Sequence, residues 1–336
     1  MREAYLYDKN EDGSVRCQLC NHRCTIKVGG RGLCGVRENR SGTLFSLVYG
    51  KVIARHVDPI EKKPLFHFLP GTSSYSIATV GCNFRCRFCQ NADISQMPTD
   101  RNQIWGEDFL PPQIVEEVLN CQAATIAYTY TEPTIYYELA LDTARLASNE
   151  GIRNIFVSNG YMTDKCLEDI YPDLHAANID LKAFSDGFYK DQCGAKLAPV
   201  LKTLETLVSQ GVWLEVTTLL IPDLNDGIEE LQRIARFLVD LSPDIPWHIS
   251  RFHPTYRLTS VPSTHAESIR RARDVGLETG LKYVYTGNLP GDEGEKTSCH
   301  QCGTLLIDRI GFSIANNRIE KGGCPQCGVS IPGVWS

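Results

Sequence analysis

Between residues 74 and 287 the chain alternates short apolar runs with longer amphipathic stretches. The apolar runs are rich in β-branched and aromatic residues, as buried strands are. They cover residues 75–80, 125–130, 154–157, 178–181, 213–221 and 247–252, with 283–285 as a seventh candidate. The amphipathic stretches predict helices over residues 111–120, 135–149, 165–171, 199–210, 227–241 and 265–275. Strands that alternate with helices predict an α/β fold with a parallel sheet.

Right-handed crossovers between successive strands would arrange this region as a full or partial β/α barrel, with the functional groups at the carboxyl ends of the strands. The flanking segments differ, because both are short in apolar runs and rich in cysteine. We therefore predict three parts: a cysteine-rich metal or cluster module over residues 1–70, a barrel over residues 71–296, and a small cysteine-rich module over residues 297–336.

Composition and charge narrow the class of protein. The 336 residues are enough for one large domain with small appendages, and a net charge of -6 does not indicate a nucleic-acid or membrane binder. Residues 1–70 are an exception, because their 12 Lys/Arg and 7 Asp/Glu give a local charge of +5. The first residues are charged and lack an apolar segment, and no run is long enough to span a bilayer. We expect a cytoplasmic protein.

Eleven of the 14 cysteines fall into three clusters with the spacing of metal ligands. The central cluster directly follows the first predicted strand and contains Cys82, Cys86 and Cys89. Iron–sulfur clusters are usually held by four thiolates, so three in one loop would leave one iron of a 4Fe–4S cube without a protein ligand. That iron could bind a cofactor or substrate. The alternative is a zinc knuckle with a distant fourth ligand.

This loop resembles the CxxxCxxC motif of the radical S-adenosylmethionine (SAM) superfamily, including an aromatic residue, Phe88, before the last cysteine. The resemblance implies a partial (β/α)6-type barrel. It also implies that the open iron chelates S-adenosylmethionine, whose reductive cleavage yields methionine and a 5'-deoxyadenosyl radical. The protein would then be an oxidoreductase or activase-like enzyme.

Polar residues follow the next strands, where a bound cofactor would lie. Glu132 can accept a hydrogen bond from an ammonium group, although it can equally be a helix N-terminal acid. It stands where radical SAM activases carry a GGE-type motif, but Tyr130 and Thr131 replace the glycines. Ser158 and Asn159 can hydrogen-bond a ribose or a carboxylate.

Asp180 and Lys182 lie two apart on one face of a strand, inside the predicted barrel. A similar DLK segment meets the cofactor in the pyruvate formate-lyase-activating group, so both are cofactor-binding candidates by resemblance; a structural salt bridge is the alternative. His253 follows the sixth strand and is a further candidate, or a loop cap. The isolated Cys193 is a candidate catalytic residue that could donate a hydrogen atom to a substrate radical, although single cysteines are more often buried apolar residues.

The two flanking cysteine sets each supply four thiolates. Cys17, Cys20, Cys24 and Cys34 fit a structural zinc or a second iron–sulfur cluster equally well. Two CxxCG knuckles near the other end match a zinc ribbon. Their cysteines are Cys299, Cys302, Cys324 and Cys327.

The whole chain is similar to the AmmeMemoRadiSam-system radical SAM enzymes, relatives of the pyruvate formate-lyase-activating enzyme. The features that carry this similarity are the four-cysteine module, the segment 58–64, the cluster loop, the Tyr-Thr-Glu-Pro loop and the terminal ribbon ending at residues 331–335. The similarity implies AMMECR-type and Memo-type partner proteins and a reductant such as flavodoxin or ferredoxin.

Three functions remain open. The enzyme could use the radical on a small molecule or nucleic acid, it could activate a glycyl-radical partner protein, or the chain could be a non-catalytic zinc-binding adaptor. The replaced glycines and the two additional cysteine modules count against the activase.

Overall fold

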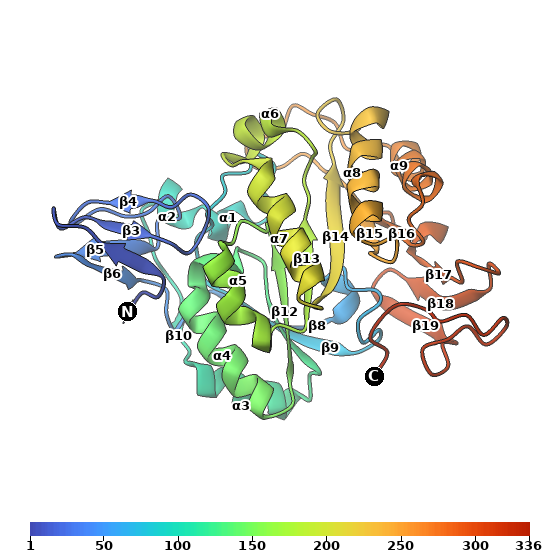
Figure 1. Cartoon of the computed structure of the whole chain (residues 1–336), viewed down its shortest axis with the longest axis horizontal. Coiled ribbons are helices and arrows are strands. Elements are labelled where there is room, and N and C mark those ends of the chain that lie inside the picture. The colour runs from blue at the N-terminus through green and yellow to red at the C-terminus, as the bar shows by residue number, and fades with distance from the viewer.

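The computed structural model describes residues 1–336 and is built around an eight-stranded, mostly parallel sheet (Figure 1). Its strands, in spatial order, are β8 (Ala54–Pro59), β9 (Ser73–Ala78), β11 (Thr125–Tyr128), β12 (Arg153–Ser158), β13 (Ala176–Asp180), β14 (Trp213–Leu220), β15 (Trp247–Arg251) and β16 (Val284–Gly287). Strands β9 to β16 run parallel and in chain order, and β8 pairs antiparallel with β9 at one edge. The predicted α/β class with a mostly parallel sheet is confirmed.

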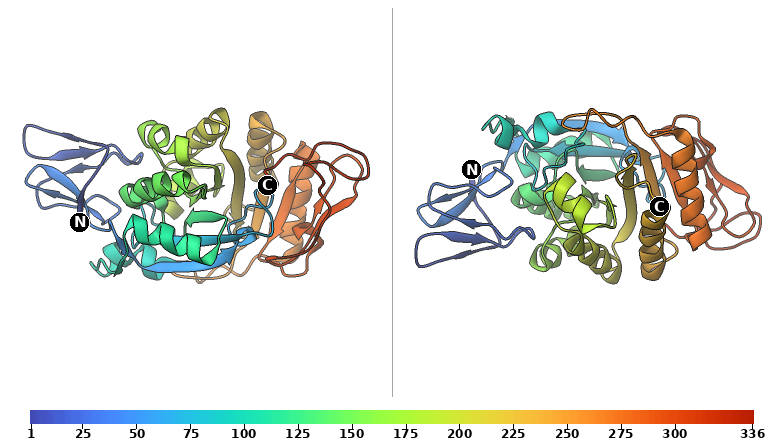
Figure 2. Two further views of the ribbon diagram at one scale, coloured as in Figure 1. Left: turned by 90° about the horizontal axis from the view of Figure 1, so that it is seen from below. Right: turned by 90° about the horizontal axis from the view of Figure 1, so that it is seen from above.

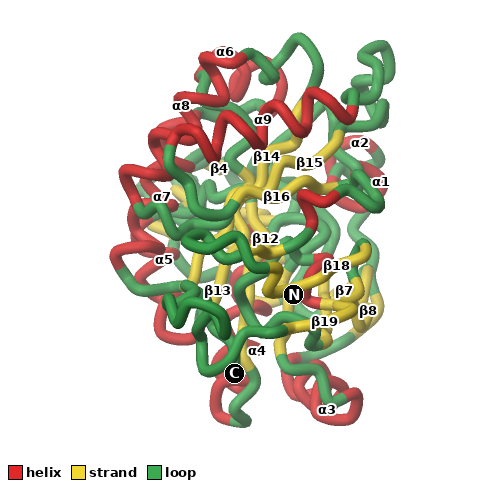
Figure 3. The backbone as a smooth tube through the Cα atoms, turned by 90° about the vertical axis from the view of Figure 1, so that its right-hand side faces the viewer, coloured by secondary structure: helices red, strands yellow, loops and turns green.

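Helices connect the parallel strands and lie along the outside of the sheet (Figures 1 and 3). They are α3 (Pro111–Cys121), α4 (Tyr137–Asn149), α5 (Asp164–Ile170), α7 (Leu197–Ser209), α8 (Ile228–Leu241) and α9 (Ala266–Thr279). In α8 the buried residues Leu231, Ile234, Ala235 and Leu238 follow the helical repeat, so one stripe packs on the strands. The loops that line the cavity described below follow the carboxyl ends of these strands.

Short helical turns occupy the loops. They are η1 (Ile60–Lys62), α1 (Ala92–Ser95), α2 (Met97–Asp100), η2 (Pro133–Tyr136), η3 (Tyr171–Asp173), α6 (Asp186–Phe188), the π-helix η4 (Tyr189–Cys193) and η5 (Glu293–Glu295). The helix predicted from residue 135 begins as α4 only at Tyr137, because Pro133 starts a 3₁₀ turn that Glu132 caps.

The N-terminal segment forms two small antiparallel sheets at one end of the molecule (Figure 2). Their strands are β1 (Arg2–Glu3), β2 (Tyr7–Lys9), β3 (Val15–Cys17), β4 (Thr25–Ile26), β5 (Arg37–Arg40) and β6 (Thr43–Ser46), while β7 (Lys51–Val52) pairs with β10 (Glu107–Asp108). Val15, Leu19 and Val36 belong to the same 70-residue hydrophobic core as the central sheet. The segment is therefore packed onto the sheet, and β8 within it extends the sheet directly.

The C-terminal segment lies at the opposite end (Figure 2). It is a three-stranded antiparallel sheet of β17 (Thr297–Ser298), β18 (Leu305–Ile310) and β19 (Ser313–Asn317). Its buried residues, such as Leu306 and Ile307, form a small apolar cluster with Phe66, Tyr283 and Tyr285, which precede it in the chain. The C-terminal sheet is therefore packed against the rest of the protein. No helix in the structure combines the length and the apolar character needed to cross a membrane.

Candidate functional site

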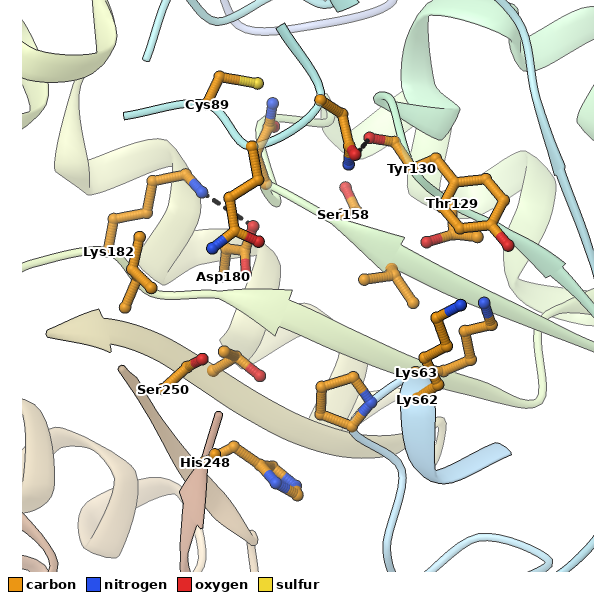
Figure 4. Close-up of a pocket in the computed structure, with 18 of the residues that line it drawn as sticks. Lys62, Lys63, Cys89, Thr129, Tyr130, Ser158, Asp180, Lys182, His248 and Ser250 are labelled. Atoms are coloured by element: carbon orange, nitrogen blue, oxygen red, sulfur yellow. Dashed lines mark hydrogen bonds and ion pairs between the residues drawn. The ribbon is translucent and has the colours of Figure 1, made fainter. Parts of the chain in front are cut away.

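The carboxyl ends of the parallel strands surround a cavity of about 580 Å³ (Figure 4). All three cysteines of the cluster loop, residues 81–91, line it, together with side chains that follow or end the successive strands. These side chains are Glu132 after β11, Ser158 at the end of β12 and Asn159 after it, Asp180 at the end of β13 and Lys182 after it, Thr217 from β14, His248 and Ser250 from β15, and Thr286 from β16. The structure thus brings together most of the candidates predicted from separate motifs.

Hydrogen bonds shape the cluster loop around its sulfur atoms. The backbone N–H of Phe84 donates to Cys82 Sγ at 3.3 Å, and Cys89 Sγ lies 3.2 Å from Ser95 Oγ. Gln96 Nε2 donates to the Phe84 carbonyl at 3.0 Å. Burial, with the nearby carboxylate of Glu132, raises the pKa of Cys82 well above its ordinary value. A bound metal would therefore have to displace the proton from this thiol.

The backbone around Cys193 is hydrogen-bonded to the cluster loop. The Cys193 carbonyl accepts the Arg85 N–H at 2.8 Å, and the carbonyl of the preceding Gln192 accepts the Arg87 N–H at 2.9 Å. A hydrogen bond from the Cys193 thiol lowers the pKa of Cys86. Cys193 is fully buried in the π-helix η4 and does not line the cavity, so the structure places it against a cluster ligand and away from a substrate.

Glu132 is held by four hydrogen bonds at the start of η2. Its Oε1 accepts from Thr134 N (3.0 Å), Thr134 Oγ1 (2.5 Å) and Ser158 Oγ (2.7 Å), whereas Oε2 accepts only from Asn159 N (2.8 Å). The carboxylate therefore caps the turn and also faces the cavity, with Oε2 able to take a further donor. Burial raises the pKa of Glu132, so a cation beside it would stabilise the ionised form.

Asp180 and Lys182 form an ion pair across the cavity wall, with 2.8 Å between Lys182 Nζ and Asp180 Oδ2. The Lys182 ammonium also lies 5.8 Å from the centre of the Phe88 ring in the cluster loop. Burial opposes the charge of Lys182, but the neighbouring Asp180, Cys86 and Cys193 outweigh burial and raise its pKa well above the ordinary value. Both the predicted cofactor role and the structural salt bridge are compatible with this placement.

His253 lies outside the cavity. Its side chain is exposed and its Nδ1 lies 3.1 Å from Ser263 Oγ, as expected for the loop-capping alternative. The histidine that the same segment does place in the cavity is His248, on β15. Its Nε2 lies 2.6 Å from the buried carboxylate of Glu215, which also accepts the backbone N–H groups of Phe66 and His67.

A lysine pair was also missed from the sequence. Lys62 and Lys63 reach the cavity from η1, on the side of Tyr130 and away from Cys89 (Figure 4). The Asp58 carboxylate accepts hydrogen bonds from both ammonium groups, with 2.8 Å to Lys62 Nζ and 2.6 Å to Lys63 Nζ. It also accepts a hydrogen bond from the Tyr130 hydroxyl. Burial lowers the pKa of Lys63 to about 8, despite the opposing effect of Asp58. The only sequence signal for this pair was the run Glu61-Lys62-Lys63-Pro64, in which an acid precedes two lysines and a proline.

The C-terminal cysteines form a compact site whose four sulfur atoms all lie within 4.8 Å of one another. Two sulfur pairs, Cys299–Cys327 and Cys302–Cys324, are 3.7 Å apart. Tetrahedral zinc with bonds of about 2.3 Å holds its thiolates about 3.8 Å apart. The four residues could thus hold a metal, and their spacing suits zinc.

Fold and site together define an α/β protein with a three-cysteine loop at the carboxyl end of its first parallel strand. The model of the radical SAM superfamily matches residues 76–238. The chain belongs to this superfamily, which confirms the predicted class of enzyme and implies a 4Fe–4S cluster and S-adenosylmethionine as cofactors.

Similar proteins cover most of the chain. It is 48% identical over 334 residues to the uncharacterized protein MJ0808 of Methanocaldococcus jannaschii, covering 98% of this chain and 99% of that protein. It is 25% identical over 212 residues to the putative glycyl-radical enzyme activating enzyme MJ1632 of the same organism, covering 60% and 76%. Streptococcus suis SuiB bound to its precursor peptide SuiA has a similar fold, with a TM-score of 0.52, 12% identity, and coverage of 68% of this chain and 51% of SuiB.

Proposed function

We propose that Cys82, Cys86 and Cys89 hold a 4Fe–4S cluster, and that the cavity beside it binds S-adenosylmethionine together with a substrate from which hydrogen is abstracted. The observation that carries this proposal is the opening of all three cysteines onto one cavity of about 580 Å³. When bound, the cluster and cofactor supply a 5'-deoxyadenosyl radical by reductive cleavage of the sulfonium.

The donor set around the cavity fits these two groups. Three thiolates satisfy three irons of a cube and leave the fourth to a non-protein ligand. S-adenosylmethionine carries an ammonium, a carboxylate and a ribose. Glu132 and Asp180 offer acceptors to the cation, Lys182 offers a donor to the anion, and two small polar residues remain for the ribose. These two are Ser158 and Asn159.

Several residues orient these groups before anything binds. The hydrogen bonds on Glu132 fix its carboxylate, so little conformational freedom is lost when a cation reaches Oε2. The N–H groups that point to Cys82 Sγ stabilise negative charge on that sulfur. Lys182 keeps a positive charge near Cys86 and is in turn held by Asp180.

We assign the substrate to the far part of the cavity. Figure 4 shows His248 on the opposite side of the cavity from Cys89, with Lys62 and Lys63 on a third side. Lysine and histidine side chains with an asparagine, Asn288, favour a substrate that carries an anionic or hydrogen-bonding group. A small molecule or a nucleotide of a nucleic acid has this character.

The second candidate function is activation of a glycyl-radical partner protein. The named activity of MJ1632 supports it, whereas the bulky Tyr130 and Thr131 at the position of the activases' glycines count against it. AMMECR-type and Memo-type proteins are the partners that the family similarity suggests, and a cytoplasmic flavodoxin or ferredoxin is the reductant. The non-catalytic adaptor would require zinc in the cluster loop.

Anaerobic reconstitution tests the proposal. The full chain, loaded with iron and sulfide and reduced with dithionite, should convert S-adenosylmethionine to 5'-deoxyadenosine, which chromatography detects. Cys86→Ala should abolish this product, while the control Cys121→Ala should not, because Cys121 is exposed on α3 and far from the cluster loop in the chain. Product formation by Cys86→Ala at the wild-type yield would disprove the cluster assignment.

A labelling experiment separates the substrate classes. Substrate hydrogen abstracted by the radical appears in 5'-deoxyadenosine, so deuterated cell extract can be fractionated into small molecules, RNA and protein and each fraction tested. Deuterium transfer from the small-molecule or RNA fraction supports the first function. Transfer from protein alone supports the activase.

A further inference from the structure

The four N-terminal cysteines gather around a second, small cavity, separate from the main one. Cys17 and Cys34 are buried, and Cys20 and Cys24 are partly exposed. Arg37 on β5 and Asn83 of the cluster loop line the same cavity. We call Cys17, Cys20, Cys24 and Cys34 the N-terminal site.

The distances between the sulfur atoms differ between this site and the C-terminal ribbon. In the ribbon, all four sulfur atoms lie within 4.8 Å of one another, as one small ion requires. No three sulfur atoms of the N-terminal site are that close, and the same is true of Cys82, Cys86 and Cys89. A cube of four irons and four sulfides spreads its thiolates further apart than a single ion does. The sulfur atoms of the N-terminal site, like those of the cluster loop, are therefore more widely spread than those of the C-terminal site.

Arg37 supplies a second, independent observation. Its residue is 1% exposed, and its Nη2 donates to Glu138 Oε1 at 2.8 Å and to the Tyr5 carbonyl at 2.6 Å. Its Nε and Nη1 are buried without a hydrogen-bond partner. Unsatisfied buried donors are costly, so a group that accepts from them is expected in the cavity that Arg37 lines. The sulfur atoms of an anionic cluster are such acceptors.

The N-terminal site is in direct contact with the cluster loop. His22 lies between Cys20 and Cys24 in the chain, and its Nε2 is 2.8 Å from the carbonyl of Asn83, the residue after Cys82. On the other side, a Cβ on Gly81 would stand 3.2 Å from the Cys34 carbonyl. Gly81 has φ = +108°, so glycine is needed both for its backbone conformation and for this close approach. Residues next to Cys82 on both sides therefore touch the N-terminal site.

We propose that the N-terminal site holds a second 4Fe–4S cluster, ligated by Cys17, Cys20, Cys24 and Cys34 and hydrogen-bonded by Arg37, and that electrons enter the enzyme through it. A one-electron protein donor reduces the second cluster, which returns to its oxidised state by passing that electron to the cluster at Cys82, Cys86 and Cys89. No bond forms or breaks in either transfer. The identity of the second cluster stands alone, whereas its role in electron entry rests on the proposed function.

Mössbauer spectroscopy of the unsubstituted chain, reconstituted with ⁵⁷Fe, tests the identity without any variant. Two clusters are expected, and S-adenosylmethionine binds only the one open iron of the cube at Cys82, Cys86 and Cys89, so the signal of about one iron in eight should change. A change in about one iron in four would mean a single cluster and would overturn the proposal.

Variants assign the iron to its ligands. Cys82→Ala/Cys86→Ala/Cys89→Ala should keep about four irons and four sulfides per chain, whereas Cys17→Ala/Cys20→Ala should keep the signal that responds to S-adenosylmethionine. Zinc is measured in the same samples. If the triple variant holds no iron but an additional zinc, the N-terminal site is a zinc site. Because the triple variant cannot bind the cofactor-cleaving cluster, its result is independent of the proposed function.

Electron entry is tested by mixing the oxidised protein with reduced flavodoxin and freezing samples at successive times. Electron paramagnetic resonance then follows how fast the cluster at Cys82, Cys86 and Cys89 is reduced, because its signal is the one that responds to S-adenosylmethionine. Cys17→Ala/Cys20→Ala should lose the fast phase, and the control Cys121→Ala, at an exposed position of α3, should retain it. An unchanged rate in the first variant would overturn the role. Arg37→Lys should keep the second cluster and shift its potential, an effect that a purely structural arginine would not produce.

Discussion

Asn159 Nδ2 donates to Asn83 Oδ1 at 2.7 Å and lies 3.8 Å from Cys82 Sγ, so the end of β12 is tied directly to the cluster loop. The Asn159 carbonyl oxygen Oδ1 accepts the Tyr161 N–H at 3.1 Å, which fixes the orientation of the amide. Asn159 also sends its backbone N–H to Glu132. Asn159 therefore links Cys82, through its side chain, to the acid that we assign to the cofactor, through its backbone.

Asn159→Ala should leave the cluster assembled but lower its reduction potential by about 40 mV, the equivalent of one N–H donor worth about 1 kcal/mol. The sign follows because a donor near the thiolate stabilises the more negative, reduced cluster. Redox titration followed by electron paramagnetic resonance measures the shift. Asn316→Ala, on the exposed face of β19, is the control and should leave the potential unchanged. An equal potential in both variants would show that the amide has no influence on the cluster.

Asp180→Asn should weaken binding of S-adenosylmethionine by roughly tenfold to a hundredfold, because a hydrogen bond between charged groups contributes about 1.5–3 kcal/mol. Lys182→Met should have an effect of the same order, whereas Lys202→Met, on the outer surface of α7, should have none. Equilibrium dialysis with the reconstituted protein gives the affinity. If Asp180→Asn lowers the thermal stability and leaves the affinity intact, the ion pair is purely structural.

Cys193→Ala distinguishes the two roles of the thiol that packs on Cys86. From its burial away from the cavity, we expect the variant to bind iron normally and to show an altered cluster potential. A hydrogen-atom donor would instead leave the potential and 5'-deoxyadenosine formation unchanged and block the final product. Cys166→Ala is the matched control, because Cys166 is also fully buried but follows a different strand. It should change neither quantity.

His67 should make the folded protein less stable in mild acid. Its Nδ1–H donates to the Pro332 carbonyl at 2.7 Å, and its Nε2 accepts from the Tyr285 hydroxyl at 2.6 Å. Burial lowers the pKa of His67 to about 4, so between that pH and about 6.5 the unfolded chain binds the proton and the folded chain does not. Stability therefore falls as the pH falls, by about 1 kcal/mol between pH 7.5 and pH 5.5 for this residue. Urea unfolding of wild type and His67→Gln at both pH values measures it, and equal pH dependences would contradict the assignment.

The sequence could predict which motifs meet at the site, because the geometry of parallel strands sends Glu132, Asn159 and Asp180 to one edge of the sheet. It could not choose between two histidines five residues apart on the same segment. His248 faces the cavity because β15 alternates its side chains and pairs in register with β14 and β16. His253 follows the strand, where no such register applies.

The contacts that β8 and η1 make with the site could not be predicted from the sequence either. Most positions of the β8 segment are exposed and only one of its six residues is buried, the charged Asp58. It therefore lacks the apolar signature of a strand and is paired only as an edge strand beside β9. That pairing carries Lys62 and Lys63 to the cavity. Similarly, Arg309 reaches the Phe66 carbonyl at 2.7 Å from a residue 243 positions away, which no local pattern encodes.

The ribbon should act on the active site through this arginine. Arg309 is buried, lies 4.2 Å from the centre of the Phe66 ring and donates to Thr297 at 2.6 Å, and Phe66 lines the main cavity. We expect the four ribbon cysteines to hold zinc, so Cys302→Ser/Cys327→Ser should lose one zinc per chain and loosen the part of the cavity wall that Phe66 forms. Metal analysis should show unchanged iron in this variant, because the ribbon and the iron sites share no ligand.

Arg309→Met distinguishes the contribution of the arginine from that of the metal. It leaves the four ribbon cysteines intact, so zinc content should stay at the wild-type value, while the lost hydrogen bonds to Phe66 and Thr297 should destabilise the fold by roughly 2–4 kcal/mol. The exposed Arg318→Met on the same ribbon should cost less than about 0.5 kcal/mol. Thermal unfolding and zinc assays on the three variants decide the matter. If Arg309→Met matches Arg318→Met in stability, the ribbon is anchored by its apolar contacts alone, and the zinc site has no path to the cavity through Arg309.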